Sequence, residues 1–326
     1  MNFSFLTPPE FLSLPIFGLD ISHFSIKVSK LKRVGANLIP EIIVDVPFSN
    51  TTELSDNKNQ EGDHKNVQVV LNQLKKKHKI NFVRVSIPEE NTYVFRTLVP
   101  KDALHSIEEF ILYNLDQYIP LDPQEVIFDY KILAKHIDDE KIPVVVTAIP
   151  KNIVEQYTAI IESCGITMVA CEPETHAIAR AVIDKDDMNP YIIINVNHYV
   201  TNISVVEDGL VQYTQTLSIA GSDMLDKMRP EVATSFKDSI NKVIIYWFTS
   251  KDQIHPNSKI ENIILTGEAL KSPNLINFLE SNLFVNATFG NVWKNCFDLD
   301  SFVPKISKQE SLKYATAIGL CLPKIK

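Results

Sequence analysis

Residues 191–219, YIIINVNHYVTNISVVEDGLVQYTQTLSI, decide the fold. Runs rich in Ile and Val alternate here with short polar turns, which predicts three strands joined by tight turns. The chain opens in the same way, because residues 16–22, 25–32 and 41–48 are also strand-like and separated by short polar breaks. Two halves that each begin with three strands predict a duplicated α/β fold.

The rest of the chain alternates between helical and strand-like segments. Apolar spacing predicts helices at 67–79, 101–118, 151–163, 174–183, 232–249, 274–281 and 312–320, and strands at 93–98, 126–133, 142–149, 166–171 and 262–266. Residues 49–66 contain almost no apolar side chain and predict a flexible loop. Residues 136–141 predict a charged hairpin turn, and Gly165 a left-handed helix end.

The composition is that of a folded globular protein. Of 326 residues, 45% are apolar and 22% charged. Lys and Arg total 32 against 40 Asp and Glu, a net charge of −8, which argues against a nucleic-acid partner. The basic run at 75–79 is interpreted as a solvated helix C-terminus rather than a nucleic-acid patch. Nine glycines, where average usage of ~7% predicts about 23, argue against an efficient nucleotide-hydrolysing site.

The sequence shows neither a targeting signal nor a disulfide pattern, which predicts a cytoplasmic protein. The opening residues contain Pro8, Pro9 and Pro15 and lack a leading positive charge, so we expect no signal peptide. No run reaches the ~18 apolar residues of a membrane span. The cysteines form no C-x-x-C pair and predict reduced thiols: Cys164, Cys171, Cys296 and Cys321.

Six stretches together resemble the PilM family of type IV pilus assembly proteins, within the actin-like ATPase superfamily. They are GLDISHFSIKV (18–28), SIEEFILYNLDQYIPLDPQEVIFDYKIL (106–133), VVVTAIPKNIVEQYTAIIESCGITMVACEPETHAIARAV (144–182), IIINVNHYVTNISVVEDGLVQYTQTLSIAGSDM (192–224), IILTGEALKSPNL (263–275) and YATAIGL (314–320). The resemblance covers about residues 16–322. The block at 106–133 separates pilus and divisome actins from sugar kinases and Hsp70-type ATPases.

The resemblance implies an actin-like, ribonuclease H-like, two-lobe α/β fold with a small α+β subdomain inserted in the first lobe. We predict an N-terminal extension at 1–15, a first lobe at 16–87 and 166–188 with a flexible loop at 49–66, and the inserted subdomain at 88–165. The second lobe follows at 189–326, with a helical subdomain shortened after Met224.

The first phosphate loop of the family reads Asp-Ile-Gly-Ser-Ser-Ser-Ile-Lys. Asp20, Ser25 and Lys27 match it, and Asp20 would hold a magnesium-linked water while Ser25 donates to phosphate. Ser22 replaces the glycine. Phe24 replaces a small serine, so its ring would occupy or flank the phosphate path.

The other nucleotide motifs depart from the family pattern as well. In the second loop Asn195 replaces an Asp and Asn197 a Gly, while Thr201 remains. In the adenosine motif Gly267 is kept, but Glu268 replaces the next glycine, and its carboxylate would repel phosphate. The implied cofactor is ATP with magnesium, held by a degenerate site of Asp20, Ser22, Ser25, Lys27, Asn195, Thr201 and Gly267. We expect weak binding and no productive hydrolysis, hence no catalytic residues.

Other site signals are weaker. Glu172, Glu174 and His176 lie close together, but the helix start favours N-terminal capping by the acids over metal ligation, so no metal site is predicted.

The leading functional hypothesis is a non-catalytic cytoplasmic scaffold of the type IV pilus machine. The resemblance implies that it binds the short N-terminus of a PilN-like inner-membrane protein, contacts other machine proteins, and reaches the membrane through these partners. We expect the peptide to bind the inserted subdomain at its junction with the first lobe.

Three alternatives stay open. A divisome FtsA-like actin depends on an amphipathic C-terminal helix, whereas this sequence ends CLPKIK. A true actin-like ATPase or kinase is opposed by the loop substitutions. A type II secretion counterpart usually continues into a membrane span.

Overall fold

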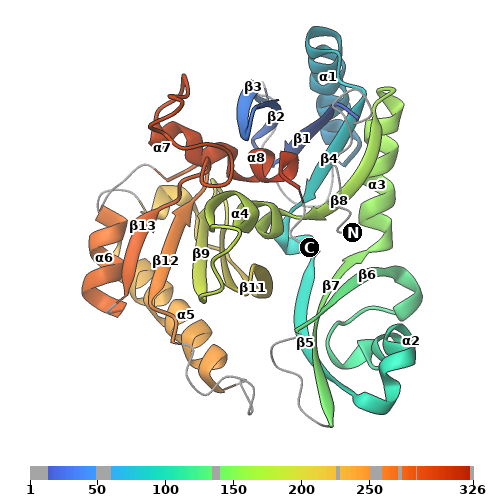
Figure 1. Ribbon diagram of the computed structural model, residues 1–326, viewed down its shortest axis with the longest axis vertical. Helices are drawn as coiled ribbons and strands as arrows, with labels where there is room; N and C mark the ends of the chain where they lie inside the picture. Colours follow the sequence, from blue (N-terminus) through green and yellow to red (C-terminus); the bar gives the residue numbers. More distant parts are fainter. Residues whose placement is uncertain are drawn as a thin grey trace, which may run out of the picture.

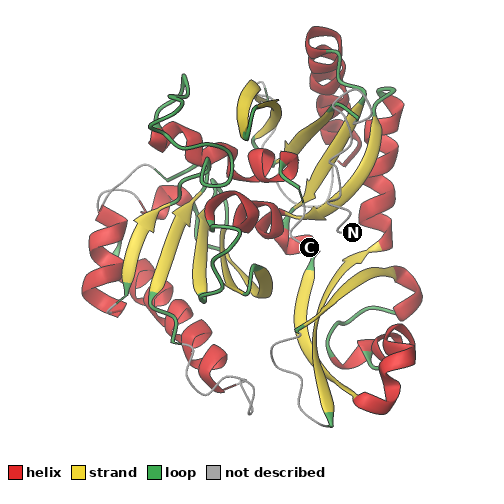
Figure 2. Ribbon diagram, viewed as in Figure 1, coloured by secondary structure: helices red, strands yellow, loops and turns green. Residues whose placement is uncertain are grey.

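The computed structural model describes residues 14–48, 60–133, 140–224, 228–249, 259–270, 274–283 and 285–323. Three β-sheets organise the chain (Figures 1 and 2). The two larger sheets share one plan, with strand orders β3-β2-β1-β4-β8 and β11-β10-β9-β12-β13. In each, three antiparallel strands come first and two parallel strands complete the sheet. The predicted duplication of an α/β unit is therefore confirmed.

The first lobe is built on β1 (Ile16–Ile21), β2 (Ser25–Val34), β3 (Asn37–Pro47), β4 (Phe82–Ile87) and β8 (Thr167–Pro173). Helices α1 (Gln60–His78) and α3 (Lys151–Ser163) pack on each other and on this sheet. Leu71 and Leu74 of α1 and Ile161 of α3 are buried with the inward side chains of β1 and β4. This burial of apolar surface is the main stabilising contribution.

The predicted flexible loop at 49–66 is partly wrong. Residues 49–59 lie outside the described residues, but helix α1 begins at Gln60. The segment QEGDHKN has no apolar stripe, so hydrophobic periodicity could not detect this part of the helix. His64 Nε2 lies 2.8 Å from Gln156 Nε2, a hydrogen bond that ties the polar start of α1 to α3.

The inserted sheet has the order β5-β7-β6, from β5 (Tyr93–Pro100), β6 (Val126–Ile132) and β7 (Lys141–Pro150). Its core is shared with α2 (Ile107–Tyr113). The helix predicted at 101–118 is interrupted: Lys101–Ser106 and Leu115–Gln117 are 3-10 turns flanking α2. Ser106 has a non-helical φ of −139°, and the Asn114 side chain donates to the Phe110 carbonyl at 2.8 Å. The predicted hairpin turn at 136–141 lies largely outside the described residues.

Helix α3 belongs by its packing to the first lobe. Tyr157, Ile160 and Ile161 join the core of the first sheet. Gly165 has φ +67° and its N–H donates to the Glu162 carbonyl at 2.7 Å, the left-handed helix end that the sequence predicts. The inserted sheet therefore ends with β7, earlier than the predicted boundary at residue 165.

The second lobe contains β9 (Tyr191–Val196), β10 (Thr201–Glu207), β11 (Leu210–Leu217), β12 (Asn262–Thr266) and β13 (Asn286–Phe289), with α5 (Pro230–Thr249) and α6 (Asn274–Leu283). Strand β13 and the short α7 (Lys308–Ser311) were not predicted, because each is only 4 residues long and too short to show a periodic pattern. Strand β4 of the first lobe was not predicted either. The shortened segment predicted after Met224 includes residues 225–227, which lie outside the described residues.

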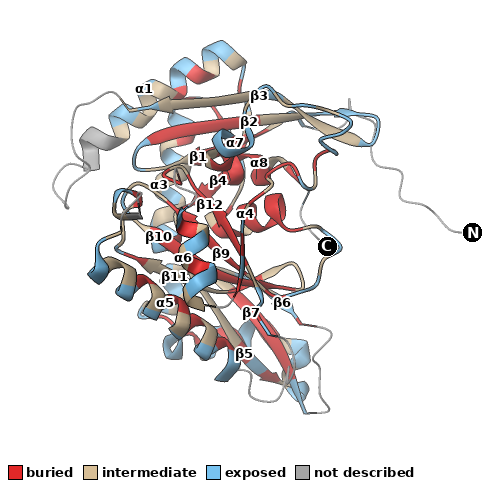
Figure 3. Cartoon of the chain, turned by 90° about the vertical axis from the view of Figure 1, so that its left-hand side faces the viewer, coloured by how far each residue is buried: buried red, intermediate tan, exposed pale blue. Residues whose placement is uncertain are grey.

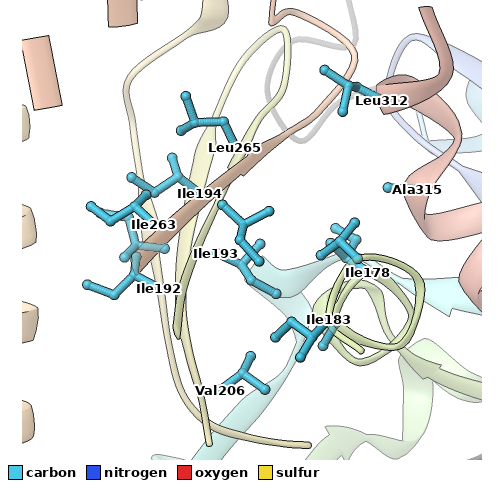
Figure 4. Close-up of a cluster of buried hydrophobic side chains, with 14 of the residues drawn as sticks. Ile178, Ile183, Ile192, Ile193, Ile194, Val206, Ile263, Leu265, Leu312 and Ala315 are labelled. Carbon is cyan, nitrogen blue, oxygen red and sulfur yellow. The ribbon is translucent and has the colours of Figure 1, made fainter. Parts of the chain in front are cut away.

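Two helices cross between the lobes, α4 (Glu174–Val182) and α8 (Ala315–Cys321) (Figure 1). A Cβ added at Gly319 of α8 would lie 1.8 Å from the Ala177 carbonyl oxygen of α4, so only glycine permits this crossing. Figure 4 shows Ile178 and Ile183 on the side of β9 that Ile193 faces, while Ile192 and Ile194 lie on the other side of the strand; all belong to one buried cluster. Figure 3 shows that buried residues concentrate along this centre.

The predictions about membrane spans and about the cysteines can be compared with the described residues. None of the helices described is both long and apolar enough to cross a membrane. All the cysteines are free, and Cys164 and Cys296 are buried.

Candidate functional site

The cleft between the lobes is almost filled by its own side chains. The turn between β1 and β2 faces the turn between β9 and β10, and the cavity they share measures about 40 Å³. Since one water molecule needs roughly 10–15 Å³ by the same measure, the cavity has room for only a few waters. In this conformation it is too small for a nucleotide.

Aromatic rings from the two turns meet across the cleft. The rings of Phe24 and His198 lie 4.3 Å apart between centroids, and those of His23 and Tyr199 lie 6.3 Å apart, edge to face. Phe24 therefore contacts the second lobe through its ring. Ring pairs at these separations attract each other.

The Ser22 side chain forms hydrogen bonds with backbone groups of its own turn, between β1 and β2. Its hydroxyl oxygen accepts from the N–H groups of Phe24 at 3.3 Å and Ser25 at 3.1 Å, and donates to the Ser25 carbonyl at 3.1 Å. In an anion-binding turn such N–H groups point at the ligand. Here they are already occupied by the residue that replaces the glycine of the family.

Lys27, which matches the phosphate-loop lysine of the family, forms an ion pair across the lobes. Its Nζ lies 2.5 Å from Glu268 Oε2 and 3.8 Å from Asp20 Oδ2, and the lysine side chain is 2% exposed. Burial disfavours the ammonium, but the charges of Asp20 and Glu268 outweigh it and raise the pKa of Lys27. Burial also raises the pKa of Asp20, which accepts from Ser86 Oγ at 2.9 Å.

Asn195 donates a hydrogen bond to the buried carboxyl group of Glu174, which the sequence alone indicated only as a helix cap. Its Nδ2 donates to Glu174 Oε1 at 2.5 Å, and Asn197 Nδ2 donates to the same oxygen at 3.4 Å. Burial raises the pKa of Glu174 well above its usual range, and the charges of Asp20 and Glu89 raise it further. An aspartate at position 195 would add a carboxylate to this cluster, which explains the amide.

Thr201 and Gly267, the other two positions that match the family motifs of the second lobe, have structural roles in the backbone. Thr201 Oγ1 donates to the Ile219 carbonyl at 2.8 Å. Gly267 has φ +120°, and a Cβ there would lie 2.2 Å from the Val196 carbonyl oxygen. Asp20, Ser22, Lys27, Asn195 and Gly267 line the cavity together, whereas Ser25 and Thr201 do not.

A larger groove lies between the inserted sheet, the first lobe and the β10–β11 turn. It measures about 230 Å³ and is mostly apolar. One wall is the face of the inserted sheet opposite α2, formed by Ile127, Asp129 and Lys131 of β6 and Val145, Thr147 and Ile149 of β7. The other linings are Val154 of α3, Cys171–Pro173 of β8, His176 and Arg180 of α4, and Gly209–Val211.

The charged side chains of Arg180 and Glu172, which line the floor of this groove, are paired with each other. Arg180 and Glu172 form a buried two-pronged ion pair, one arm of which measures 3.1 Å. Arg180 Nε also donates to the Gly319 carbonyl at 3.0 Å. These polar groups therefore hold the floor in shape, and the apolar walls are the surface that remains for a ligand.

Strand β6 presents a free edge along the groove. Within the described residues it pairs only with β7. The Leu133 N–H donates to the Pro143 carbonyl at 2.9 Å, so alternation turns the N–H and C=O groups of Phe128, Tyr130 and Ile132 away from β7. Consistently, the Tyr130 N–H donates to Asp129 Oδ1 at 2.9 Å. Such an edge offers backbone groups to an added strand.

Comparison with known proteins identifies the family. The family model described as type IV pilus assembly protein PilM matches residues 18–238. The chain belongs to the PilM family. Its predicted membership, and with it a setting in type IV pilus assembly, is therefore confirmed, and no curated protein matches the sequence.

Solved structures show the PilM fold. The PilM–PilN type IV pilus biogenesis complex contains a chain that is 17% identical, with a TM-score of 0.75 over 96% of this chain and 99% of that one. The cytoplasmic domain of EpsL from the type II secretion system of Vibrio cholerae scores 0.48 at 9% identity, over 86% and 92% of the two chains. A Bacteroides thetaiotaomicron protein with an actin-like ATPase fold scores 0.47 at 11% identity, over 88% and 93%. The match to the chain of the PilM–PilN complex, together with the two sheets of one plan, confirms the predicted actin-like, two-lobe α/β fold.

Proposed function

We propose that this PilM-family protein is a scaffold that captures the N-terminal peptide of a PilN-like inner-membrane protein in the groove beside β6. The observation that carries the proposal is the free edge of β6 bordering a mostly apolar groove. The related structure is named as a complex of PilM with PilN. Through this partner the protein would work on the cytoplasmic side of the inner membrane, together with other proteins of the pilus machine.

The groove suits an extended peptide. Added to β6, a peptide strand would bond to the outward N–H and C=O groups, with the Asp129 carboxylate released from the Tyr130 N–H. Alternate side chains of a strand point the same way at a spacing of roughly 7 Å. They would contact the apolar walls formed by Ile127, Val145 and Ile149.

The peptide proposal predicts that Ile127→Glu weakens binding at least tenfold. Ile127 is 47% exposed, so the substitution spares the core and places a charge against apolar peptide side chains. The measurement is the fluorescence anisotropy of a labelled peptide that copies the first ten or so residues of a PilN-like protein. Val69→Glu on α1, where Val69 is 57% exposed, is the matched control and should bind as the wild type does. Equal binding by Ile127→Glu and wild type would exclude this groove.

We also propose that the scaffold works without turning over a nucleotide. The closed cleft, the Lys27–Glu268 ion pair and the occupied N–H groups of the first turn support this proposal. If the cleft opened, Asp20 and Lys27 are the residues that would face a magnesium–phosphate group. Glu268 would then repel the phosphate.

The nucleotide proposal predicts that calorimetry detects no tight magnesium–ATP binding and that phosphate release stays at the buffer rate. Asn195→Asp with Glu268→Gly should restore binding only in part, because Phe24 still contacts His198 across the cleft. Micromolar affinity together with phosphate release by the unaltered protein would contradict the proposal.

A further inference from the structure

Glu174 places a carboxyl group in the junction between the lobes. It is the first residue of α4, one of the two helices that cross between the lobes, and it lines the cavity of about 40 Å³. Its hydrogen bonds come from the side-chain amides of Asn195 and Asn197 in the second lobe. In the part of the chain that the structure describes, no cationic side chain lies within ion-pair distance of this carboxyl group.

The two lysines that line the cavity are paired with other carboxylates. Lys27 Nζ lies 2.5 Å from Glu268 Oε2 and 3.8 Å from Asp20 Oδ2. Lys313 Nζ lies 2.8 Å from Asp45 Oδ2. The positive charge at the cavity is therefore already neutralised by these three carboxylates.

Glu89 occupies the position near Glu174 where a carboxylate is best stabilised. It lies in the 3-10 turn Glu89–Asn91 and is 3% exposed. Its Oε2 accepts from the Thr175 N–H at 3.2 Å and from the Thr175 hydroxyl at 2.8 Å, and its Oε1 accepts from the Thr92 hydroxyl at 3.3 Å. Since the start of a helix favours a negative charge, Glu89 holds the charge at the start of α4. Ionisation of Glu174 would place a second negative charge beside it.

The other titratable groups around this carboxyl group supply no cation to it either. Burial raises the pKa of Tyr157 on α3, and the nearby carboxyl groups raise it further, so this phenol stays neutral. His23 Nε2 lies 3.7 Å from Glu90 Oε1, and the His198 ring contacts the Phe24 ring. Tyr199, beside His198 in the same turn, is a neutral phenol that contacts the His23 ring.

We propose that the closed cleft depends on a proton held by Glu174. With this proton the carboxyl group is neutral and accepts hydrogen bonds from the two asparagine amides of the second lobe. Without it, a negative charge that lacks a cation faces Asp20 of the first lobe and Glu89. An unpaired carboxylate is unfavourable in a junction from which water is excluded. Repulsion from Asp20 then favours movement of α4 and the second lobe away from the first lobe, which admits water to the charge.

The direction of the pH dependence follows from this arrangement. Burial raises the pKa of Glu174 well above its usual range, and the charges of Asp20, Glu89 and Glu90 raise it further. The closed protein therefore binds this proton more tightly than the unfolded chain does. The stability of the closed form falls as the pH rises from the ordinary glutamate pKa toward the raised pKa of Glu174. This inference rests on neither the peptide proposal nor the nucleotide proposal.

Glu174→Gln is the test variant, because glutamine has the shape of the neutral carboxyl group and its side chain cannot ionise. Urea unfolding of the full chain gives an unfolding constant for each protein at each pH. The ratio of the wild-type constant to that of Glu174→Gln should rise at least tenfold between about pH 4.5 and about pH 8, a change that corresponds to one unit of pKa or more. Glu155→Gln, on an exposed site of α3, is the matched control, and its ratio should stay nearly constant.

Hydrogen exchange distinguishes opening of the cleft from burial of an acid that leaves the cleft unchanged. At about pH 8 the backbone amides of α4 and of the β9–β10 turn should exchange at least tenfold faster in the wild type than in Glu174→Gln, because one unit of pKa is a factor of ten in the opening equilibrium. The amides of α2, in the inserted unit, should exchange alike in the two proteins. At about pH 5 the two proteins should agree throughout.

Infrared spectroscopy reports the proton directly. In deuterated buffer at about pH 7, the C=O band of neutral carboxyl groups should be weaker in Glu174→Gln than in the wild type. An unchanged band, an unchanged ratio of unfolding constants, or exchange that is equally fast in α4 of both proteins would overturn the proposal. So would an acceleration that is the same in α2 as in α4. Neither peptide nor nucleotide is present in these measurements, so their failure would leave the proposed function standing.

Discussion

Gly319→Ala is expected to lower the free energy of unfolding by about 3 kcal/mol, the upper end of the usual cost of overpacking. Its Cβ would lie 1.8 Å from the Ala177 oxygen and 2.4 Å from the Ala177 carbonyl carbon. These are backbone atoms of α4, so no side chain can turn away to make room. The two helices that join the lobes would have to separate, and Gly319→Val should leave no folded protein.

Gly35→Ala is the matched control for this substitution. Gly35 lies in the β2–β3 turn with φ +62°, and no atom lies within 4 Å of a Cβ built there. Only the left-handed conformation opposes alanine, at a cost of about 1 kcal/mol. Urea unfolding of both variants measures the difference. Equal losses would mean that the helix crossing relaxes freely, contrary to the close contact.

Lys27→Met is expected to cost about 3–5 kcal/mol of unfolding free energy, the usual price of leaving a buried charge without its partner. The Glu268 side chain is 8% exposed, and Asp20 lies on the other side of the ammonium, 3.8 Å away. Without Lys27, two carboxyl groups from opposite lobes face each other in a cavity of about 40 Å³. Both lobes are thus destabilised at their contact.

Two further variants separate charge from packing. Lys27→Met with Glu268→Gln should recover much of the loss, because only the Asp20 carboxyl group then lacks a cation, and it keeps its hydrogen bond from Ser86 Oγ. Lys30→Met is the surface control: its Nζ lies 2.8 Å from Glu41 Oε2, but the two side chains are 24% and 41% exposed. Such pairs contribute less than about 1 kcal/mol. A Lys27→Met variant as stable as Lys30→Met would contradict the role of the buried pair.

Most strands of the two lobes could be predicted because they are buried and apolar, but β4 and β13 were not. Ile192, Ile193 and Ile194 are almost fully buried, and such runs are visible in a single sequence. Boundaries were less predictable where polar residues form structure, as at the start of α1. The interrupted helix around α2 depends on the backbone of Ser106, which periodicity does not report.

Long-range pairing explains what the sequence left open at the site. Lys27 matches a phosphate-loop lysine in sequence, yet its partner Glu268 is 241 positions away and comes from the other lobe. Glu174 could be placed at a helix start, but its contact with Asn195 depends on how the lobes meet. The sequence therefore identified Lys27, Glu174 and Asn195 as site residues or helix caps, whereas the contacts between them and the other lobe depend on the complete fold.

The choice of sheet edge was open for the same reason. Strands β5 and β6 both border the inserted sheet. In the structure β5 contacts the second lobe, where the Arg96 guanidinium lies 5.4 Å from the centre of the Trp247 ring. That leaves β6 beside the groove as the candidate for an added strand.

The ion pair between Lys27 and Glu268 has a consequence for the physiology of the pilus. If the protein binds no nucleotide, as we propose, side chains of the chain itself join the lobes, and we expect the shape of this protein to be the same at any ratio of ATP to ADP. A starved cell and a growing cell would then present the same scaffold. Any dependence of pilus assembly on metabolic state would have to enter through other components, or through how many copies of this protein the cell makes.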